Sequence, residues 1–200
     1  INELSIKQLF SGLYANTNIN EEPMSAGRQM GAHFNTPLLN SDGTWKKLID
    51  HKNSSSDISC TGSQMPRLLG LAQASKLYRK LDFKNSKNFS KNGNEIAWGT
   101  IGNASTSEGV FCEILNAAGV HQVPMVISIW DDKYGISVEN KDQTIKEDIS
   151  EALSGFKRTP QKKGFEILTV NGWDYPDLIN TYQKASDIAR VEHVPVIVHV

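Results

Sequence analysis

Apolar and polar positions alternate in blocks along most of this chain. From residue 58 onward, short runs rich in Val and Ile are separated by longer stretches in which apolar residues recur at helical spacing. The apolar runs predict strands at 94–102, 123–132, 165–172 and 194–200. The periodic stretches predict helices at 63–81, 106–119 and 175–191. Strands that alternate with helices and are apolar on both faces indicate an α/β fold, a doubly wound, mainly parallel sheet with helices on both faces.

Local signals place the ends of two of these helices. Pro66 suits the first turn of the helix in 63–81. Thr106 and Ser107 are expected to cap the helix in 106–119, with Glu108 in its first turn and Gly119 at its end.

The remaining segments have weaker patterns. The chain begins with a short amphipathic stretch and then becomes rich in turn residues, so 1–57 is predicted to be an N-terminal helix and irregular loop segment. Residues 138–163 are charged and are expected to form loop with some helix. The α/β domain is therefore expected to span 58–200.

Composition and charge narrow the classes of partner. The 200 residues are 38% hydrophobic and 22% charged with a net charge of −1, typical of a soluble globular protein. This balance does not favour a nucleic-acid or acidic-membrane partner, and no apolar run is long enough to span a bilayer. Two cysteines without a CxxC pair form neither a disulfide framework nor a zinc site, which favours the cytoplasm. Cys112 is expected in the core.

The first candidate site lies at the end of the strand in 94–102. Ligands bind at the carboxyl ends of strands in doubly wound sheets, where loops meet helix N-termini. Gly102 allows a sharp bend, and the small residues at 104–107 leave room for a phosphate near free backbone N–H groups. Taken alone, the same residues also fit a plain strand-to-helix turn.

The second candidate site follows the strand in 123–132. Asp131 and Asp132 end that strand, and Asn103 ends the preceding one, 29 positions before Asp132 (132 − 103). One helix and one strand fill that interval, so both residues are expected at the same edge of adjacent strands. Amide, carboxylate and backbone oxygens are ligands that Mg²⁺ accepts, with a diphosphate completing its shell. The alternative is that the paired acids only end the strand and face water.

Several phrases in the chain resemble a known family. They are "GRQMGAHF" (27–34), "SQMPRLLGLAQASK" (63–76), "SEGVFCEILNAAGVHQVPMV" (107–126), "DDKYGIS" (131–137) and "ILTVNGWD" (167–174). The pattern from Gly102 to Asp132 resembles the thiamine diphosphate motif, usually written GDG…NN. More closely, residues 27–200 resemble the α-type domain of the E1 component of 2-oxo acid dehydrogenase complexes, and the branched-chain branch in particular.

The resemblance implies roles for individual residues. Asn103, Asp132 and the carbonyl of Tyr134 would be the Mg²⁺ ligands. Gly102, Asn103, Ala104 and Ser105 match the turn that holds the diphosphate of thiamine diphosphate. Ser59 and Thr61 match backbone positions that contact the cofactor's rings, and Ile136 matches an apolar residue beside the cofactor. His33 matches a histidine near the active-site channel, although an ordinary polar loop residue is an equal alternative.

The chain departs from the family at the metal ligands. The usual acid is Asn103 and the usual amide is Asp132. The pair therefore keeps one acid and one amide, so that the neutralising charge is moved rather than lost. We expect metal binding to be retained.

The resemblance also implies partners. A β-type E1 domain, fused or separate, would supply the glutamate that activates the cofactor, and no stretch here resembles it. We therefore expect a piece of a longer polypeptide, inactive alone, in a homo- or hetero-oligomer. The intact enzyme would decarboxylate a small 2-oxo acid and pass the acyl group to the lipoyl domain of an E2 acyltransferase. Transketolase-like sugar chemistry and a non-catalytic assembly domain of the same fold remain as alternatives.

Overall fold

The computed structural model describes residues 4–29, 35–55 and 58–200. The chain divides into two compact units. The N-terminal unit comprises Ile1–Ser59 and Phe83–Lys91, and the α/β unit comprises Cys60–Asp82 and Asn92–Val200.

The N-terminal unit contains one α-helix among its described residues, α1 (Ile6–Leu13), as the amphipathic start of the chain predicts. A capping box begins it, because the Ser5 hydroxyl accepts from the Gln8 backbone N–H at 3.2 Å and the Gln8 side chain accepts from the Ser5 N–H at 2.9 Å. Short 3₁₀ turns occur at Leu48–Asp50 and Ser86–Asn88. The other described residues of this unit form turns and loops, with one isolated antiparallel bridge between Leu39 and Trp45.

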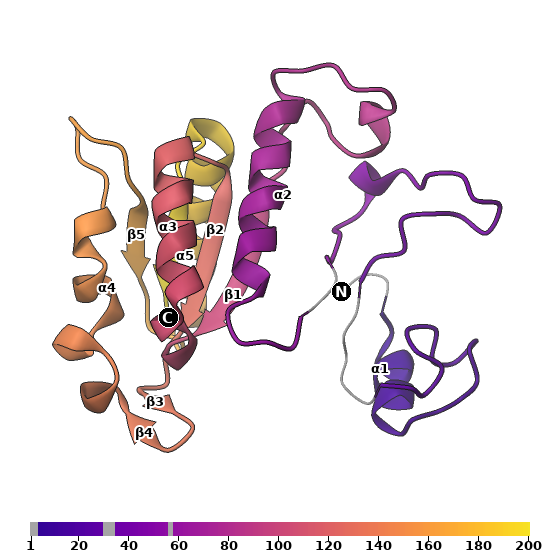
Figure 1. Ribbon diagram of the computed structural model, residues 1–200, viewed down its shortest axis with the longest axis horizontal. Coiled ribbons are helices and arrows are strands. Elements are labelled where there is room, and N and C mark those ends of the chain that lie inside the picture. Colours follow the sequence, from indigo (N-terminus) through magenta and orange to yellow (C-terminus); the bar gives the residue numbers. More distant parts are fainter. Residues whose placement is uncertain (1–3, 30–34, 56–57) are drawn as a thin grey trace. The chain divides into compact units, whose positions relative to one another are not determined.

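The α/β unit is organised around a parallel sheet (Figure 1). Its helices are α2 (Gln64–Tyr78), α3 (Gly109–His121), α4 (Ile149–Ala152) and α5 (Tyr175–Asp187). The sheet strands are β1 (Ala97–Gly102), β2 (Met125–Trp130), β5 (Glu166–Thr169) and β6 (Val196–His199), in the order β1-β2-β6-β5. The β1–β2 register runs from Ala97 opposite Met125 to Gly102 opposite Trp130, so Asn103 and Asp131 follow these strands at the same edge.

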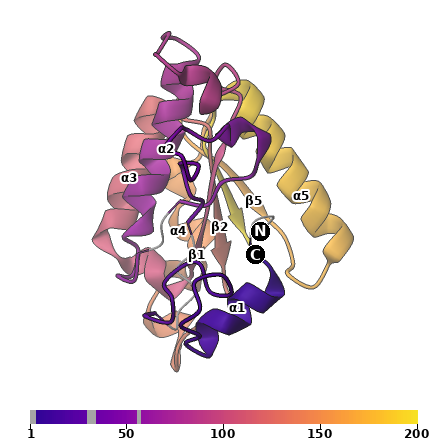
Figure 2. The ribbon, with the colours of Figure 1, turned by 90° about the vertical axis from the view of Figure 1, so that its right-hand side faces the viewer.

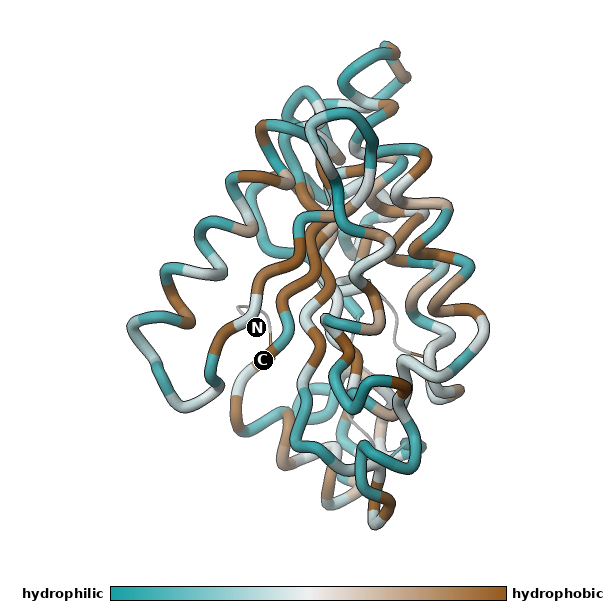
Figure 3. The backbone as a smooth tube through the Cα atoms, turned by 90° about the vertical axis from the view of Figure 1, so that its left-hand side faces the viewer, coloured by the Kyte–Doolittle hydropathy of each residue, from teal (hydrophilic) through white to brown (hydrophobic). Residues whose placement is uncertain are grey.

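Each face of the sheet has its own apolar cluster. Alternate residues of β2 point to opposite faces, since the side-chain period of a strand is two. Met125, Ile127 and Ile129 pack with α2 and α3, whereas Val126 packs with α5. Figure 2 shows α2 and α3 on one side of the strands and α5 on the other, and Figure 3 shows the strands as the most apolar part of this unit. The prediction of a doubly wound sheet is confirmed.

The predicted ends of the helix in 106–119 are wrong. Residues Ala104–Ser107 form a 3₁₀ turn, so α3 begins only at Gly109, with Glu108 as its N-cap. Gly119 lies inside the helix, which ends where Gln122 adopts a left-handed conformation at φ 49°. The expectation that Cys112 is buried is also wrong, because it is exposed.

The charged stretch 138–163 consists of short elements. The two-residue strands β3 (Tyr134–Gly135) and β4 (Val138–Glu139) form a small antiparallel hairpin just before it and at its start. Single 3₁₀ turns follow at Asn140–Asp142, Ile145–Glu147 and Ser154–Phe156, with α4 between the last two. The segment α5 continues into a π-helical turn at Ile188–Glu192.

Candidate cofactor site

The turn after β1 is fixed by backbone contacts at the edge of the sheet. The Asn103 backbone N–H donates to the Trp130 carbonyl at 3.1 Å, extending the β1–β2 pairing by one residue. The Thr106 hydroxyl donates to the Asn103 carbonyl at 2.6 Å and closes the 3₁₀ turn. Asn103 is buried, while Gly102 is exposed. The turn therefore fixes the position of one buried amide and leaves its glycine open to a ligand.

The two acids after β2 have opposite environments. The Asp131 side chain is 1% exposed, and its Oδ1 accepts from the Lys133 backbone N–H at 2.8 Å. Asp132 is exposed, and its Oδ1 accepts from the Tyr134 backbone N–H at 3.0 Å. Adjacent carboxylates thus divide into one built into the sheet edge and one available to solvent or a ligand.

Asn140 connects the two segments. Its Nδ2 donates to both carboxylate oxygens of Asp131 at 3.2 Å, and its Oδ1 accepts from the Asn103 Nδ2 at 3.0 Å. Asn140 and Asn103 are each 4% exposed. A continuous, buried polar contact therefore joins the turn after β1 to the loop after β2.

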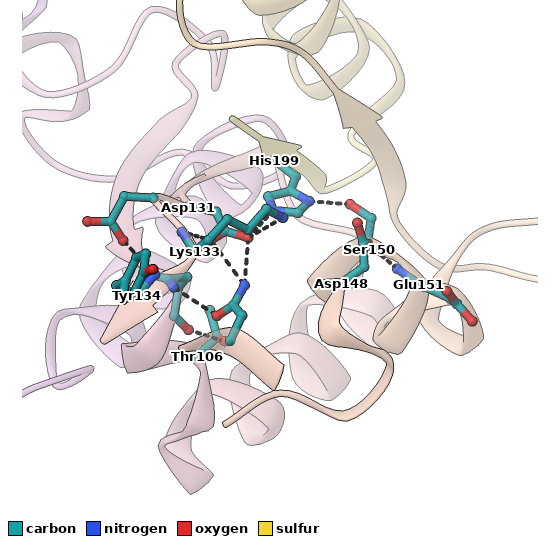
Figure 4. A network of polar contacts seen from close by, with 11 residues as sticks. Thr106, Asp131, Lys133, Tyr134, Asp148, Ser150, Glu151 and His199 are labelled. Atoms are coloured by element: carbon teal, nitrogen blue, oxygen red, sulfur yellow. Dashed lines mark hydrogen bonds and ion pairs between the residues drawn. The ribbon is translucent and has the colours of Figure 1, made fainter. Parts of the chain in front are cut away.

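His199 at the end of β6 contacts Asp131 from the other side. Its Nε2 lies 2.9 Å from Asp131 Oδ2, and its Nδ1 lies 2.8 Å from the Ser150 hydroxyl on α4 (Figure 4). In Ser-His-Asp hydrolases the hydroxyl bonds to Nε2 and the carboxylate to Nδ1, the reverse of this arrangement. We interpret these contacts as a structural tie between α4 and the sheet.

The electrostatics of this edge favour an ionised Asp131. Burial of the carboxyl opposes ionisation, but hydrogen bonds from His199 and Lys133 and the nearby Lys133 ammonium hold the pKa of Asp131 below its ordinary value. The Lys133 Nζ lies 3.2 Å from Asp131 Oδ2. Asp131 is therefore an acceptor with no proton to donate.

The two segments also touch through Gly135. A Cβ at this position would lie 2.7 Å from the Ala104 Cβ and 2.4 Å from the Gln143 Nε2. At Gly102, by contrast, a Cβ would meet only the Ser105 hydroxyl, at 3.9 Å. The loop after β2 is thus packed against the turn after β1, while the space beside Gly102 stays open.

The structure brings only part of the predicted site together. Asn103 lies in the buried polar contact, and Asp132 and Tyr134 lie in the adjoining loop. Ser59 and Thr61 are exposed residues of the loop before α2. His33 lies outside the described residues. Ala104 and Ser105, two of the expected diphosphate contacts, lie in the 3₁₀ turn. Gly102, a third, ends β1 just before this turn.

Ile136 has an unusual backbone and environment. It is fully exposed, with a relative accessibility of 105%, and its φ is 58°. A β-branched residue in the left-handed region is a genuine outlier, and such residues cluster at functional sites. A fully exposed isoleucine in that conformation is consistent with an apolar residue that contacts a ligand.

Sequence reasoning missed three members of this edge. The sequence patterns do not single out Asn140 or His199, and they do not separate Asp131 from Asp132. One signal for His199 was present, since it ends a strand of the same parallel sheet and must lie at the same edge as Asp131. Asn140 gave no such signal, because it lies in a loop whose path depends on tertiary structure.

Two features are absent from the described residues. The described residues contain no group of three or more His, Cys, Asp or Glu side chains that could hold a metal ion. No helix in the described part of the chain is long and apolar enough to cross a membrane.

Comparisons with known proteins agree on one family. The sequence profile of the family "Dehydrogenase E1 component" matches residues 26–200. The 2-oxoisovalerate dehydrogenase subunit alpha of Bacillus subtilis is 29% identical over 177 residues, which are 88% of this chain and 44% of that protein. The chain thus spans less than half the length of this curated relative.

A solved structure supports the fold. Transketolase from Campylobacter jejuni matches with a TM-score of 0.51 and 18% identity, covering 69% of this chain and 20% of that chain. At this identity the match shows the fold alone. The resemblance to an α-type E1 domain is confirmed by the family profile and the curated relative, and the chain belongs to the dehydrogenase E1 component family.

Proposed function

We propose that this chain anchors thiamine diphosphate and Mg²⁺ in a 2-oxo acid dehydrogenase E1, as the α-type part of the enzyme. One observation carries the proposal. The turn after β1 and the loop after β2 meet at the carboxyl edge of a parallel sheet, where the buried Asn140 side chain accepts from Asn103 and donates to Asp131. Family membership supplies the cofactor class, and this edge supplies a place for its charged end.

The chemistry of the donors fits Mg²⁺. Asn103 uses its Nδ2 for Asn140, and its Oδ1 accepts no hydrogen bond from any described residue. Asp132 offers an exposed carboxylate, and the hydrogen bond from Tyr134 keeps that carboxylate beside the Tyr134 backbone. Amide, carboxylate and carbonyl oxygens are hard ligands that suit this ion, which binds through few protein groups plus phosphate oxygens. Asn103, Asp132 and the Tyr134 carbonyl are the proposed ligands.

A second, overlapping set of residues would hold the organic cofactor. Gly102, Asn103, Ala104 and Ser105 form the proposed diphosphate turn, supported by the open space beside Gly102. Ile136 would pack against the cofactor, which gives its exposed side chain an apolar neighbour. Ser59 and Thr61 would contact the rings through their backbone, and His33 would lie near the channel.

The protein's part in the reaction is binding and orientation. When bound, thiamine diphosphate supplies the carbon nucleophile and electron sink needed for decarboxylation of a 2-oxo acid. Residues of this chain would hold the charged end of the cofactor in place and neutralise it. A β-type E1 domain would complete the active site, and the lipoyl domain of an E2 acyltransferase would accept the acyl group.

The test measures cofactor binding and turnover in the full-length polypeptide with its β-type region. We expect Mg²⁺-dependent binding of thiamine diphosphate by calorimetry, and decarboxylation with lipoyl reduction when branched-chain 2-oxo acids, pyruvate and 2-oxoglutarate are compared. Ketol transfer without lipoyl reduction would favour a transketolase-like enzyme. Absence of binding would leave a non-catalytic assembly domain.

Two variants test the ligands. Asn103→Ala and Asp132→Asn should each weaken Mg²⁺ affinity more than about tenfold. The effect of Asp132→Asn should be larger because it removes the charged ligand. Asp82→Asn, an exposed acid in the loop after α2, is the matched control and should bind normally. Unimpaired Mg²⁺ affinity in both ligand variants would refute the assignment.

A further inference from the structure

Asn103 can be a metal ligand only if the oxygen end of its amide, and not the NH₂ end, faces the proposed metal. A carboxylate presents oxygen either way, but an asparagine presents either an oxygen or an NH₂ group, and only the oxygen binds a cation. The side chain must therefore be held in one of two orientations that differ little in shape.

Asp131 fixes the orientation of Asn140. The Asp131 side chain is buried; its Oδ1 accepts from the Lys133 backbone N–H at 2.8 Å and its Oδ2 lies 3.2 Å from the Lys133 ammonium, so both oxygens act as acceptors. Both of its oxygens lie 3.2 Å from the same atom of Asn140, which must be the NH₂ nitrogen. The Asn140 oxygen consequently faces the other way, towards Asn103.

Asn140 in turn fixes the orientation of Asn103. A carbonyl oxygen only accepts, so the Asn103 atom 3.0 Å away must be its NH₂ nitrogen. The Asn103 Oδ1 is then turned away from Asn140. Reversing either amide would place two donors or two acceptors together at residues that are 4% exposed, which costs about 1–3 kcal/mol.

We propose that Asn140 is a positioning residue that transmits the polarity of the Asp131 carboxylate to Asn103 and so directs the Asn103 oxygen to Mg²⁺. This inference rests on the proposed function. It explains how a neutral amide can serve at the first ligand position in this chain. The buried charge of Asp131 lies behind the ligand and sets its direction, while Asp132 supplies charge to the metal.

Asn140→Leu removes the relay while filling a similar volume. With the full-length protein, thiamine diphosphate and Mg²⁺ as the probes, calorimetry should show Mg²⁺ affinity weakened about 10- to 100-fold, the range found when outer-shell partners of metal ligands are lost. Thr144→Val is the control, because Thr144 lies four residues further along the same loop and its buried hydroxyl has no hydrogen-bond partner among the described residues. Its Mg²⁺ affinity should stay within about twofold of the parent.

A double variant provides a readout that loss of folding cannot imitate. Asn103→Asp alone places a second acceptor against the Asn140 oxygen, and Asp131→Asn alone removes the group that orients Asn140. Together they allow the relay to run in reverse, with residue 131 donating to the Asn140 oxygen and the Asn140 NH₂ donating to residue 103. The melting temperature of the cofactor-free double variant should therefore lie above that expected from adding the two single effects.

The outcomes separate the two proposals. Additive effects on the melting temperature would overturn the relay whether or not a metal binds. Normal Mg²⁺ affinity in Asn140→Leu would overturn the positioning role while leaving the proposed function intact. A parent protein that binds neither Mg²⁺ nor thiamine diphosphate would overturn the proposed function and the metal-directed role together, but a non-additive melting temperature would still establish the relay.

Discussion

The α/β unit and the N-terminal unit bury different kinds of groups. In the α/β unit, two apolar clusters cover the two faces of the sheet, and many of their side chains are completely buried. In the described part of the N-terminal unit, the buried side chains are mainly polar, namely Ser11, Glu22, Thr36 and Ser90, with Leu48 as the large hydrophobic exception. The α/β unit gains stability from non-directional apolar burial, whereas the N-terminal unit depends on specific polar contacts.

Glu22 shows what such a polar contact involves. Its carboxylate accepts from the backbone N–H groups of Met24 at 2.8 Å, Ser25 at 2.8 Å and Gly27 at 3.0 Å, and from the Ser25 hydroxyl at 2.7 Å. One side chain thereby satisfies three backbone donors in a loop. A loop without a large apolar core can thus be ordered by a single buried carboxylate that accepts several hydrogen bonds.

The largest expected effect comes from emptying the apolar core. Leu115 on α3 is fully buried, so Leu115→Ala should lower the free energy of unfolding by about 2–5 kcal/mol. Leu71→Ala on α2, which removes a side chain that is 48% exposed, is the matched control and should have a much smaller effect. Urea unfolding followed by fluorescence checks this, and three of the four tryptophans lie in the α/β unit. Equal losses in both variants would contradict the comparison.

A smaller and more local effect is expected at Glu22. Glu22→Ala leaves three partly buried backbone donors without their acceptor, so local opening of residues 22–27 should become easier by about 1–3 kcal/mol. Hydrogen exchange of the Met24, Ser25 and Gly27 amides measures it. Glu21→Ala is the control, since Glu21 is only partly buried and pairs with Lys7 at the surface. Unchanged hydrogen exchange of these amides in Glu22→Ala would show that the loop does not depend on the buried carboxylate.

The effect confined to the narrowest range of conditions is a pH dependence in acid. Burial opposes ionisation of the carboxyl, but its four hydrogen bonds lower the pKa of Glu22 from 4.5 to about 2. Because the folded-state pKa is depressed, the stabilisation is fully present above pH 4.5 and is lost as the pH falls towards 2. The carboxyl ¹³C shift should titrate near the lower value, and Glu22→Gln should abolish this part of the pH dependence. A titration near 4.5 would mean that the carboxylate is not held by the loop.

The same contrast explains what could be predicted from the sequence. Strands β2 and β6 are apolar runs whose burial on both faces is visible in their composition, and Pro66 marked the start of α2 correctly. The role of Glu22 could not be predicted, because it depends on three backbone N–H groups that converge on the carboxylate only in the folded loop. The same limit applies to Asn140, whose partners lie 37 and 9 positions away.

The positions of site residues that follow directly from strand register could be predicted. Those that depend on side-chain hydrogen bonds between distant residues could not. Asn103 follows β1 at the edge where β2 ends, as the spacing predicts. Which of two neighbouring acids becomes buried depends on His199 and Asn140, so the division between Asp131 and Asp132 could not be obtained from their sequence. The ligand roles of Asn103, Asp132 and Tyr134 remain predictions.

The close approach of Gly135 to Ala104 has a consequence for substitution in this family. The space between these two positions holds one methyl group, and in this chain Ala104 provides it. Alanine at 135 therefore requires glycine at 104 together with a shift of the flexible Gln143 side chain, although 31 residues separate positions 104 and 135 (135 − 104). A mutant library that treats the two positions as independent would misjudge Gly135→Ala, which fits only beside glycine at 104.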